Sequence, residues 1–522
     1  MNADLLIAQF DRIAEAPDAV PRLRRFILDL AVRGRLVEQD PTDGRTYPRL
    51  PTGENTMEGP YELPLTWQWY TIGDITANHG QKVPDRDFTY IDVSAIDSAR
   101  GVVENPQILK PNEAPSRARR IVQSGDVIYA TVRPYLLNVA VIDRDYNPPA
   151  IASTAFVVLS GIGFTLPRFL WLVLRSPYFV KLVEEQMRGQ AYPAINDRAF
   201  KNLPIPLPPL QEQHRIVAKV DELMAVCDEL EARQQERETQ RDRTVMAVLH
   251  TLVEKEQKDR AFVDTVHFYL RNFADLTVRR EHVQQLRRTI LDLAVRGKLV
   301  ENDVIPFQAE NSFSGELPYV LPDSWRWVTL GDVGDWGAGT TPPRSESSYY
   351  GGGITWLKSG ELNDTIGLTG SEETVTQLAI DRLSFRLNKP GDLLLAMYGA
   401  TIGKLAILGE FAVTNQAVCG CTPYEGISTR YLFIYLLSQR NRLRGKSEGG
   451  AQPNISKTKI LKYPCPLPPL SEQHRIVAKV DELMAVCDAL EQQLIMQEQD
   501  QQRFMEAALR EAMAPAEQYM LG

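Results

Sequence analysis

Two stretches of the chain contain residue types that bind phosphate or zinc, but their spacing suits neither task. The run Gly399–Lys404 is one residue shorter than a phosphate-binding P-loop, and Leu405 follows where a serine or threonine would bind magnesium. Because the same place in the other half of the chain holds a pair of apolar runs, we expect a β-turn. Cys419 and Cys421 lack a second pair of zinc ligands, since Cys465 supplies only one more thiol. The spacing therefore predicts neither a P-loop nor a metal site.

Three further candidates for catalysis are equally weak. Asn147–Ala150 is similar to the NPP-aromatic loop of adenine-N6 methyltransferases, but alanine stands where that loop needs a stacking ring. No glycine-rich cofactor loop precedes it, so we expect a proline turn. His214 and His474 open two nearly identical helices, where capping or packing is the favoured role. With no nucleophile–base pair in either half, the chain is predicted to be a binding protein without catalytic residues.

A long internal repeat organises the rest of the chain. Pro206–Asp228 and Pro466–Asp488 match at 22 of 23 positions, and the one difference is Gln211 against Ser471. Each copy begins at a double proline, which can open a helix but cannot continue one. Within the first copy the apolar residues are spaced by four and three, as in a heptad seam: Ile216, Val220, Leu223, Cys227 and Leu230. A helix from residue 211 to about 254 would be roughly 65 Å long, and we favour paired helices over a surface helix.

A shorter repeat precedes each half. Leu23–Val37 and Leu286–Val300 differ at two of fifteen positions. Apolar residues at helical spacing predict a helix in each copy, with Gly34 and Gly297 as C-terminal stops. Residues 2–15 also have a helical pattern. Cys227 and Cys487, which are equivalent positions in the long repeat, are predicted core residues.

Two bodies of similar size lie between the short and long repeats. They match at their beginnings, their middles and their ends, but the offset drifts from 258 to 266 to 260, as expected for shared strands joined by different loops. Strands are predicted at 126–132, 139–142 and 155–159, and helices at 166–188 and 430–444. The predicted segments are an N-terminal helical segment (1–60), a first body (61–205), a central helical spacer (206–316), a second body (317–465) and a C-terminal helix (466–522).

The order of the repeats predicts the overall plan. If both halves fold alike, the last helix must pack near the first. We therefore expect an α+β chain in which long paired (coiled-coil) helices separate two mixed α/β bodies, in a pseudo-twofold cyclic arrangement.

Composition limits the class of protein. The 522 residues are 43% hydrophobic and 24% charged, as in ordinary globular proteins, and no run is apolar enough for a membrane span. Five scattered cysteines and the lack of a secretory signal favour the cytoplasm. The net charge of −9 argues against a protein that binds nucleic acid unaided. Residues 430–462 are the exception, with eight Lys or Arg and only one acid.

The two bodies differ in sequence, whereas the repeats that flank them, which we call the frame, are nearly identical. This contrast predicts two different ligands held at one fixed spacing. DNA suits this plan, because two readers on one face of a duplex sit about one helical turn, roughly 34–36 Å, apart. The chain resembles the DNA-specificity (S) subunit of type I restriction–modification systems over essentially its whole length. The resemblance rests on the PLPPLxEQHRIV junctions and on three second-body segments: GTTPPRSESSYYGGGITWLKSGEL from Gly339, NKPGDLLLAMYGATIGKLAIL from Asn388, and TNQAVCGC from Thr414. The first body departs further, with ASTAF at 152–156 and no GTTPPR-like loop.

The resemblance implies a division of labour. Each body would be a target recognition domain that reads one half of a bipartite, asymmetric DNA site. The helices would dock two modification subunits that methylate adenine with S-adenosylmethionine, and up to two restriction subunits that use ATP and magnesium can join them. None of these cofactors would bind this chain directly.

Basic and amide side chains are the expected contacts to phosphates and base edges. In the first body the candidates are Arg117, Arg119, Arg120, Arg133, Tyr135, Arg188, Gln190, Tyr192, Asn196, Arg198 and Lys201. In the second body they are Arg344, Lys358, Arg442, Arg444, Lys446, Gln452, Asn454, Lys457 and Lys459. Gln452 and Asn454 are the preferred base readers, because glutamine and asparagine pair with adenine through two hydrogen bonds. The alternative for any of these residues is a solvated basic surface.

Two other functions remain open at this point. A methyltransferase or nuclease with its own catalytic site requires a cofactor loop or a carboxylate cluster. A two-headed protein-binding scaffold requires apolar grooves for peptides.

Overall fold

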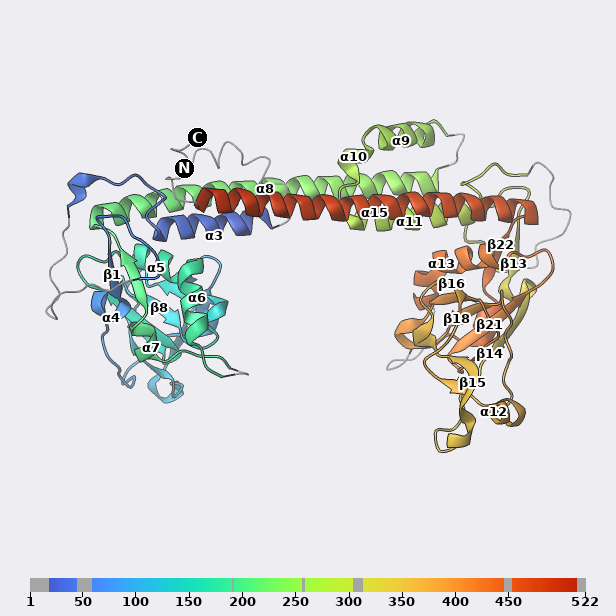
Figure 1. Cartoon of the computed structure of the whole chain (residues 1–522), viewed down its shortest axis with the longest axis horizontal. Coiled ribbons are helices and arrows are strands. Elements are labelled where there is room, and N and C mark those ends of the chain that lie inside the picture. The colour runs from blue at the N-terminus through green and yellow to red at the C-terminus, as the bar shows by residue number, and fades with distance from the viewer. Residues whose placement is uncertain are drawn as a thin grey trace. The chain divides into compact units, whose positions relative to one another are not determined.

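The computed structural model describes residues 18–44, 59–189, 192–255, 259–303, 313–445 and 453–513. The chain divides into two compact units, one of Met1–Glu236 with Glu498–Gly522 and one of Arg237–Gln497. The two long helices, α8 (Leu210–Glu254) and α15 (Leu470–Met513), each contribute residues to both units (Figure 1). The predicted helix from residue 211 to about 254 is therefore confirmed.

In the described part of the chain, no helix has the combined length and apolarity that a membrane crossing requires.

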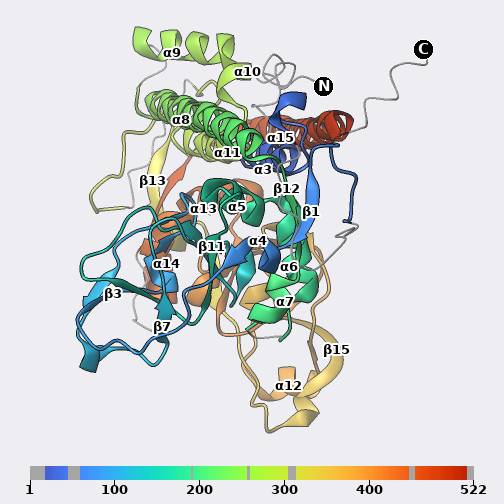
Figure 2. The same ribbon diagram turned by 90° about the vertical axis from the view of Figure 1, so that its left-hand side faces the viewer.

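Among the described residues, the body of the first unit is built on two four-stranded sheets, a short ladder and a two-stranded hairpin of β4 (Ile96–Asp97) and β5 (Val102–Val103). One sheet has the order β2-β11-β8-β9, with strands at Thr76–Ala77, Phe156–Gly161, Val127–Ala130 and Val139–Val141. The other has the order β6-β3-β10-β7, with strands at Gln107–Leu109, Phe88–Ile91, Ala150–Ser153 and Ala118–Ile121. Figure 2 shows β3 and β7 on the side of this body away from the helices α6 (Pro177–Gln186) and α7 (Asp197–Lys201). The strands predicted at 126–132, 139–142 and 155–159 are thus confirmed as β8, β9 and β11.

One predicted helix of the first body is two helices. The expected helix at 166–188 is broken into α5 (Pro167–Arg175) and α6. Pro177 has no N–H to donate to the preceding turn, and the Ser176 side chain accepts from the Phe179 N–H to begin α6. Both helices pack against α3 (Ala19–Val32) (Figure 1).

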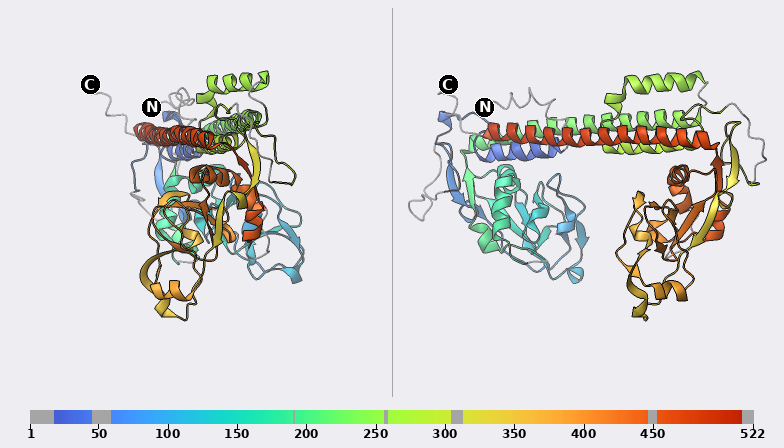
Figure 3. Two further views of the ribbon diagram at one scale, coloured as in Figure 1. Left: turned by 90° about the vertical axis from the view of Figure 1, so that its right-hand side faces the viewer. Right: turned by 45° about the vertical axis from the view of Figure 1, so that its right-hand side comes forward.

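The body of the second unit repeats this plan with longer strands. A five-stranded sheet has the order β14-β21-β18-β19-β16, with strands at Gly334–Ala338, Val418–Pro423, Leu393–Ala396, Leu405–Leu408 and Thr365–Leu368. A three-stranded sheet has the order β17-β15-β20, with strands at Thr374–Val375, Tyr350–Leu357 and Val413–Thr414. Within this unit, β15 and α12 (Gln377–Arg382) lie at the end of the body remote from α11 (Arg280–Val295), as Figures 1 and 3 show. The helix predicted at 430–444 is confirmed as α13 (Thr429–Gly445), and it packs against α11.

Each body is closed by a short antiparallel ladder that joins its first strand to its last. β1 (Gln68–Thr71) pairs with β12 (Pro204–Leu207), and β13 (Arg326–Thr329) pairs with β22 (Pro464–Leu467). The registers are equivalent, since the first residue of each early strand lies opposite the last residue of its partner. The ladder places the exit from each body directly before a long helix.

The same ion pairs hold the short repeat against the long one in both units. In the first unit the Arg24 guanidinium lies 2.6 Å from Asp228 and 2.9 Å from Glu231. In the second unit Arg287 makes the equivalent contacts to Asp488 and Glu491, at 2.7 and 3.0 Å. The seam residues of the long repeat are buried or half-buried in both copies, and Cys227 and Cys487 are each 1% exposed. The predicted core role of these cysteines is confirmed.

The end of each long helix packs against the beginning of the helix that carries the short repeat in the unit that it enters. In the first unit, Met505 of α15 is buried against Ala19 of α3, and Glu506 lies 3.4 Å from Arg22. In the second unit, Asp242 of α8 contacts Arg279 and His282 at the start of α11. The prediction that the last helix packs near the first is therefore confirmed. Residues 2–15, for which a helix is also predicted, lie outside the described part of the chain.

Candidate nucleic-acid interface

Two buried side chains fix the angle at which each body meets its long helix. Glu212 accepts from the Trp67 indole N–H at 2.9 Å and from the Gln39 amide at 2.6 Å. Gln213 accepts from the Leu166 N–H at 2.8 Å and donates to the carbonyl oxygens of Phe164 and Pro208. In the second unit Glu472 accepts from the Trp325 indole N–H at 2.6 Å. Gln473 makes three hydrogen bonds equivalent to those of Gln213: it accepts from the Ser428 N–H and donates to the carbonyl oxygens of Gly426 and Pro468.

These junction residues were missed by sequence analysis, although a signal was present. Gln213 lies three residues before Ile216 and so continues the buried seam by one step. Of the two roles expected for the histidines next to them, packing is wrong. His214 and His474 were expected to cap or pack, but both side chains are exposed. The polar residues that are actually buried at this place are Glu212 and Gln213 and their equivalents.

The turn after the central hairpin strand is anchored in the same way in both bodies. In the first body η4 (Pro134–Leu136) connects β8 to β9, and in the second η8 (Gly399–Thr401) connects β18 to β19. The Arg133 N–H donates to the Pro193 carbonyl at 2.8 Å, and the Gly399 N–H donates to the Pro453 carbonyl at 2.8 Å. The β-turn predicted at Gly399–Lys404, in place of a P-loop, is therefore confirmed. The segment before each long helix thus lies beside this turn.

The structure brings a set of predicted first-body residues to one surface around η4. Backbone bridges join Val132 and Arg188 to Ala194, and the Arg133 guanidinium lies 4.7 Å from the centre of the Tyr192 ring. Arg120 forms an ion pair with Asp197 of α7. We call this surface the first basic face, and it consists of Arg120, Arg133, Tyr135, Arg188, Tyr192, Asn196 and Arg198.

The charges on the first basic face are only partly balanced within the body. Arg120 is paired with Asp197. Arg133, Arg188 and Arg198 are exposed and make no ion pair with another described residue. Asn196 is occupied locally, because its side-chain oxygen caps α7 by accepting from the Ala199 N–H at 2.8 Å. The free cations are therefore the residues suited to phosphate or base contacts, whereas Asn196 is committed to the helix start.

The remaining first-body candidates lie next to this face or outside the described residues. Arg117 is exposed just before β7, and Arg119 is half-buried on that strand. Lys201 is half-buried at the end of α7. Gln190 lies outside the part of the chain that the structure describes.

In the second body, Arg344 and Lys358 form a separate group with their own acids. The Arg344 guanidinium makes two hydrogen bonds to Glu373, at 2.6 and 3.0 Å, and stacks on the Tyr350 ring. The Lys358 ammonium lies 2.9 Å from Glu373 and 3.3 Å from Glu372. Hydrogen bonds from Arg344 and Lys358 lower the pKa of Glu373 to about 2. These two cations are therefore already paired with carboxylates, of which Glu373 stays ionised.

The other second-body candidates lie beside the turn η8 or on helices of the same body. Asn454 is exposed and pairs with Tyr398 at the edge of η8. The Arg444 Nε donates to the Ile402 carbonyl at 3.1 Å, so this arginine braces the same turn. Arg442 instead lines a cavity of about 320 Å³ beside Tyr319 and Trp327. Lys457 and Lys459 are exposed on α14 (Lys457–Leu461), whereas Lys446 and Gln452 lie outside the described residues.

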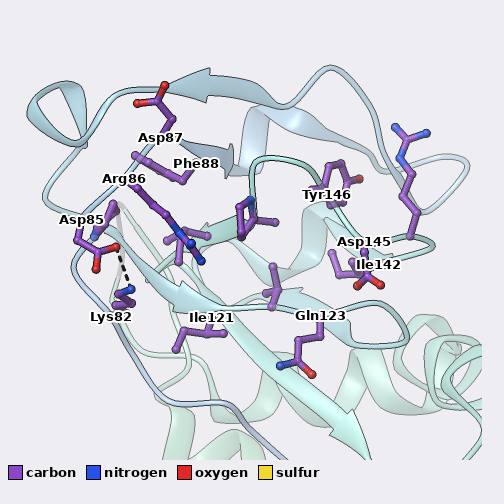
Figure 4. Close-up of a pocket in the computed structure, with 16 residues that line it drawn as sticks. Lys82, Asp85, Arg86, Asp87, Phe88, Ile121, Gln123, Ile142, Asp145 and Tyr146 are labelled. Carbon is purple, nitrogen blue, oxygen red and sulfur yellow. Dashed lines mark ion pairs between the residues drawn. The ribbon is translucent and has the colours of Figure 1, made fainter.

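One charged pocket of the first body was not predicted. It encloses about 350 Å³ and is lined by aromatic, aliphatic and charged side chains that include Phe88 and Tyr146. Figure 4 shows Arg86 extending toward its middle and the ion pair between Lys82 and Asp85, which are 2.8 Å apart. Three cations (Lys82, Arg86 and Arg144) and three carboxylates (Asp85, Asp87 and Asp145) line it. Because these charges balance, the pocket offers no net attraction for phosphate.

The buried cysteines of the second body are unsuited to nucleophilic chemistry. Cys419, Cys421 and Cys465 are fully buried, and burial raises the pKa of all three thiols. Among the described residues no group of three or more His, Cys, Asp or Glu side chains is arranged to hold a metal ion.

The fold and its two turns define a duplicated protein with two related but unequal recognition bodies. The profile of the "Type I restriction modification DNA specificity domain" matches residues 64–239 and again residues 322–497. These matches span more than half of the chain, so the chain belongs to this family and is a type I specificity subunit with two target recognition domains.

Individual relatives agree with the family assignment. The chain is 26% identical to the type I restriction enzyme EcoAI specificity subunit of Escherichia coli, over 90% of each chain. It is 24% identical to the EcoEI specificity subunit of the same species, over 94% of this chain and 93% of the relative. A chain from a structure of complex assembly and conformational transition of the type I R-M system aligns with a TM-score of 0.55 and 29% identity, over 87% of this chain and 99% of that one.

Proposed function

We propose that this chain is the sequence-specific DNA-binding subunit of a type I restriction–modification complex and that each body reads one half of a bipartite, asymmetric site. One observation carries this proposal. The ion pairs that hold the short repeat to the long helix are the same in both units, whereas the exposed residues at the turns η4 and η8 differ. The frame contacts of Arg24 and Arg287 agree within 0.1 Å between the two units. The exposed residues around η4 and η8 differ in charge and in size. A fixed frame with variable reading surfaces supports two different half-sites held at one spacing.

The second part of the proposal concerns protein partners. Several side chains of the long repeat are identical in both copies although they are exposed, and folding does not require that identity. They include His214 and His474, and also Val226 and Val486, which are 38% and 56% exposed. An exposed surface that is identical in both copies is best explained by one kind of partner that binds to each copy. We assign it to two modification subunits, and restriction subunits can join them.

The chemistry is assigned to those partners. In this proposal the modification subunits methylate an adenine in each half-site with S-adenosylmethionine, and restriction subunits use ATP and magnesium. This chain binds none of these cofactors and acts as a non-catalytic subunit in the cytoplasm. Its contribution is to place the modification subunits on a chosen sequence.

Sequencing of methylated adenines in cells with and without this chain tests the proposal. A bipartite methylated motif that disappears when the chain is deleted is the expected result. A motif that persists in the deletion strain contradicts the proposal. A parallel assay with the purified chain alone separates a specificity subunit from a methyltransferase, because the proposal predicts no binding of labelled S-adenosylmethionine.

A further inference from the structure

The turn Arg133–Leu137 in the first body has an unusual backbone. Arg133 and Leu137 both lie in the left-handed region, with φ of 49° and 53°. The equivalent residues of the second body are Gly399 and Gly403, with φ of 62° and 82°. Residues with a Cβ atom rarely adopt this conformation, whereas glycine adopts it freely. The first body therefore retains two side chains at positions where the backbone alone would favour glycine.

Space around the turn indicates where the first of these side chains points. A Cβ atom added to Gly399 would have no heavy atom within 4 Å, so a side chain at this position extends into the open. In the first body the position is occupied by Arg133, which is exposed and lies over Tyr192. Local strain combined with solvent exposure is typical of a functional site and not of a packing site.

The turn also exposes apolar side chains that the second body buries. Tyr135 and Leu136 are 45% and 49% exposed, and the neighbouring Tyr192 is 68% exposed. The equivalent of Leu136 in the second body is Ile402, which is 1% exposed. An exposed cluster of aromatic and aliphatic side chains marks an interaction surface.

The charges around this cluster identify its partner as duplex DNA. Arg133, Arg188 and Arg198 have no acidic partner among the described residues, and the nearby Asp197 is already paired with Arg120. Arginine reads guanine through two hydrogen bonds, and apolar side chains contact the thymine methyl group or wedge between base steps. A peptide partner would instead require an apolar groove with a less cationic rim.

The turn is held rigidly enough to read bases. The N–H of Arg133 donates to Pro193, and the N–H groups of Leu136 and Leu137 donate back to the carbonyls of Arg133 and Pro134 at 3.0 Å. Pro134 is buried and fixes its own φ. A site held by its supporting contacts loses little order on binding.

We propose that Arg133, Tyr135 and Leu136 contact base pairs of the half-site read by the first body. At the equivalent positions of the second body, Gly399 has no side chain and Ile402 is 1% exposed, so neither position can supply the contacts proposed for Arg133 and Leu136. This inference rests on the proposed function and adds the residues that determine one half of the specificity.

The test is an Arg133→Gly substitution, which copies the second body. The variant chain, assembled with its modification subunits, selects bound duplexes from a library randomised over two helical turns, and the selected duplexes are sequenced. We expect the preference at one or two base pairs of the first half-site to fall about 10-fold to 100-fold, with the second half-site unchanged. Because glycine suits the left-handed backbone, the variant is expected to unfold at no lower temperature than the natural chain.

Two controls make the result decisive. Ile108→Ala removes a side chain in the same body that is 64% exposed on β6, and it should leave both half-site preferences intact. An unchanged first half-site in Arg133→Gly overturns the inference, and so does an equal loss at both half-sites. If the natural complex selects no sequence at all, the proposed function itself fails, which is a distinguishable outcome.

Discussion

The buried amide of Gln213 offers a direct test of how the frame is joined to the bodies. It is fully buried and makes three hydrogen bonds, to the N–H of Leu166 and to the carbonyls of Phe164 and Pro208. Gln213→Ala leaves these three backbone groups without a partner. At about 1 kcal/mol for each, the lower end of the cost of an unpaired buried group, the loss is about 3 kcal/mol of local stability.

Gln473→Ala should cost the same amount in the other unit. Gln473 repeats all three contacts, with distances of 2.8, 3.3 and 3.0 Å to Ser428, Gly426 and Pro468. The two substitutions should nevertheless act in different places. Gln213→Ala should loosen the start of α5, and Gln473→Ala should loosen the start of α13.

Hydrogen–deuterium exchange measured by mass spectrometry resolves these two places. A loss of about 3 kcal/mol raises the opening constant of the affected segment about 100-fold. Gln211→Ala is the matched control, since Gln211 is exposed and is the one position at which the long repeats differ. Equal exchange in Gln213→Ala and Gln211→Ala, or faster exchange at α13 in the Gln213 variant, would refute the role given to the junction.

Three more predictions concern charge. Arg188→Ala combined with Arg198→Ala should weaken DNA binding by the assembled complex and reduce the slope of log affinity against log salt by about 1.8, because each lost phosphate contact contributes about 0.9. Arg24→Ala and Arg287→Ala should each lower the stability of their own unit by about 1 kcal/mol or less, since their partners are mostly exposed. Burial raises the pKa of Glu212, so its contribution to stability is complete below the ordinary glutamate pKa and is lost as the pH rises through the raised value. Glu212→Gln should therefore flatten the dependence of the first unit's melting temperature on pH across that interval.

Matched variants and opposing outcomes accompany these predictions. The control for the salt slope is Arg344→Ala with Lys358→Ala, whose charges Glu372 and Glu373 already neutralise, and it should change the slope less. A larger change in the control would reverse the assignment of phosphate contacts. A difference above about 2 kcal/mol between Arg24→Ala and Arg287→Ala would contradict the equivalence of the two frames. Identical pH curves for Glu212→Gln and the natural chain would remove the role given to its burial.

The helices that carry the short and long repeats could be predicted from the sequence because each repeat occurs twice in the chain. Near-identity over the long repeat indicated a duplicated helix, and the order of the repeats required that the last helix meet the first. The contacts of Met505 with Ala19 and of Asp242 with Arg279 are the result. Repeats carry this information because equivalent residues must make equivalent contacts.

The closing ladder of each body could not be predicted from local patterns. Pro204 and Pro206 argue against a strand, because proline donates no hydrogen bond to a ladder. They are tolerated here because, among the described strands, β12 pairs with β1 alone. Its position is set by contacts between residues far apart in the chain, which local propensity does not contain.

The first basic face was only partly predictable from the sequence. The structure gathers several of the predicted basic residues of the first body beside η4, and their contact with DNA stays a prediction. Composition could not separate Arg188, which makes no ion pair with another described residue, from Arg120, which Asp197 neutralises. The sequence contains one indication of the strained turn at Arg133. When the two bodies are aligned, Gly399 lies opposite Arg133 and Gly403 lies opposite Leu137. Only the backbone angles reveal that the first body keeps the glycine conformation without the glycines.

The most direct test of the central claim is an exchange of the second body. Residues 317–465 would be replaced by the equivalent segment of a relative, and methylated adenines would then be sequenced in cells that carry the hybrid chain. Two independent readers on one frame predict a motif with one new half, one unchanged half and an unchanged spacing between them. A change in both halves, or in the spacing alone, would contradict the claim that each body reads its own half-site.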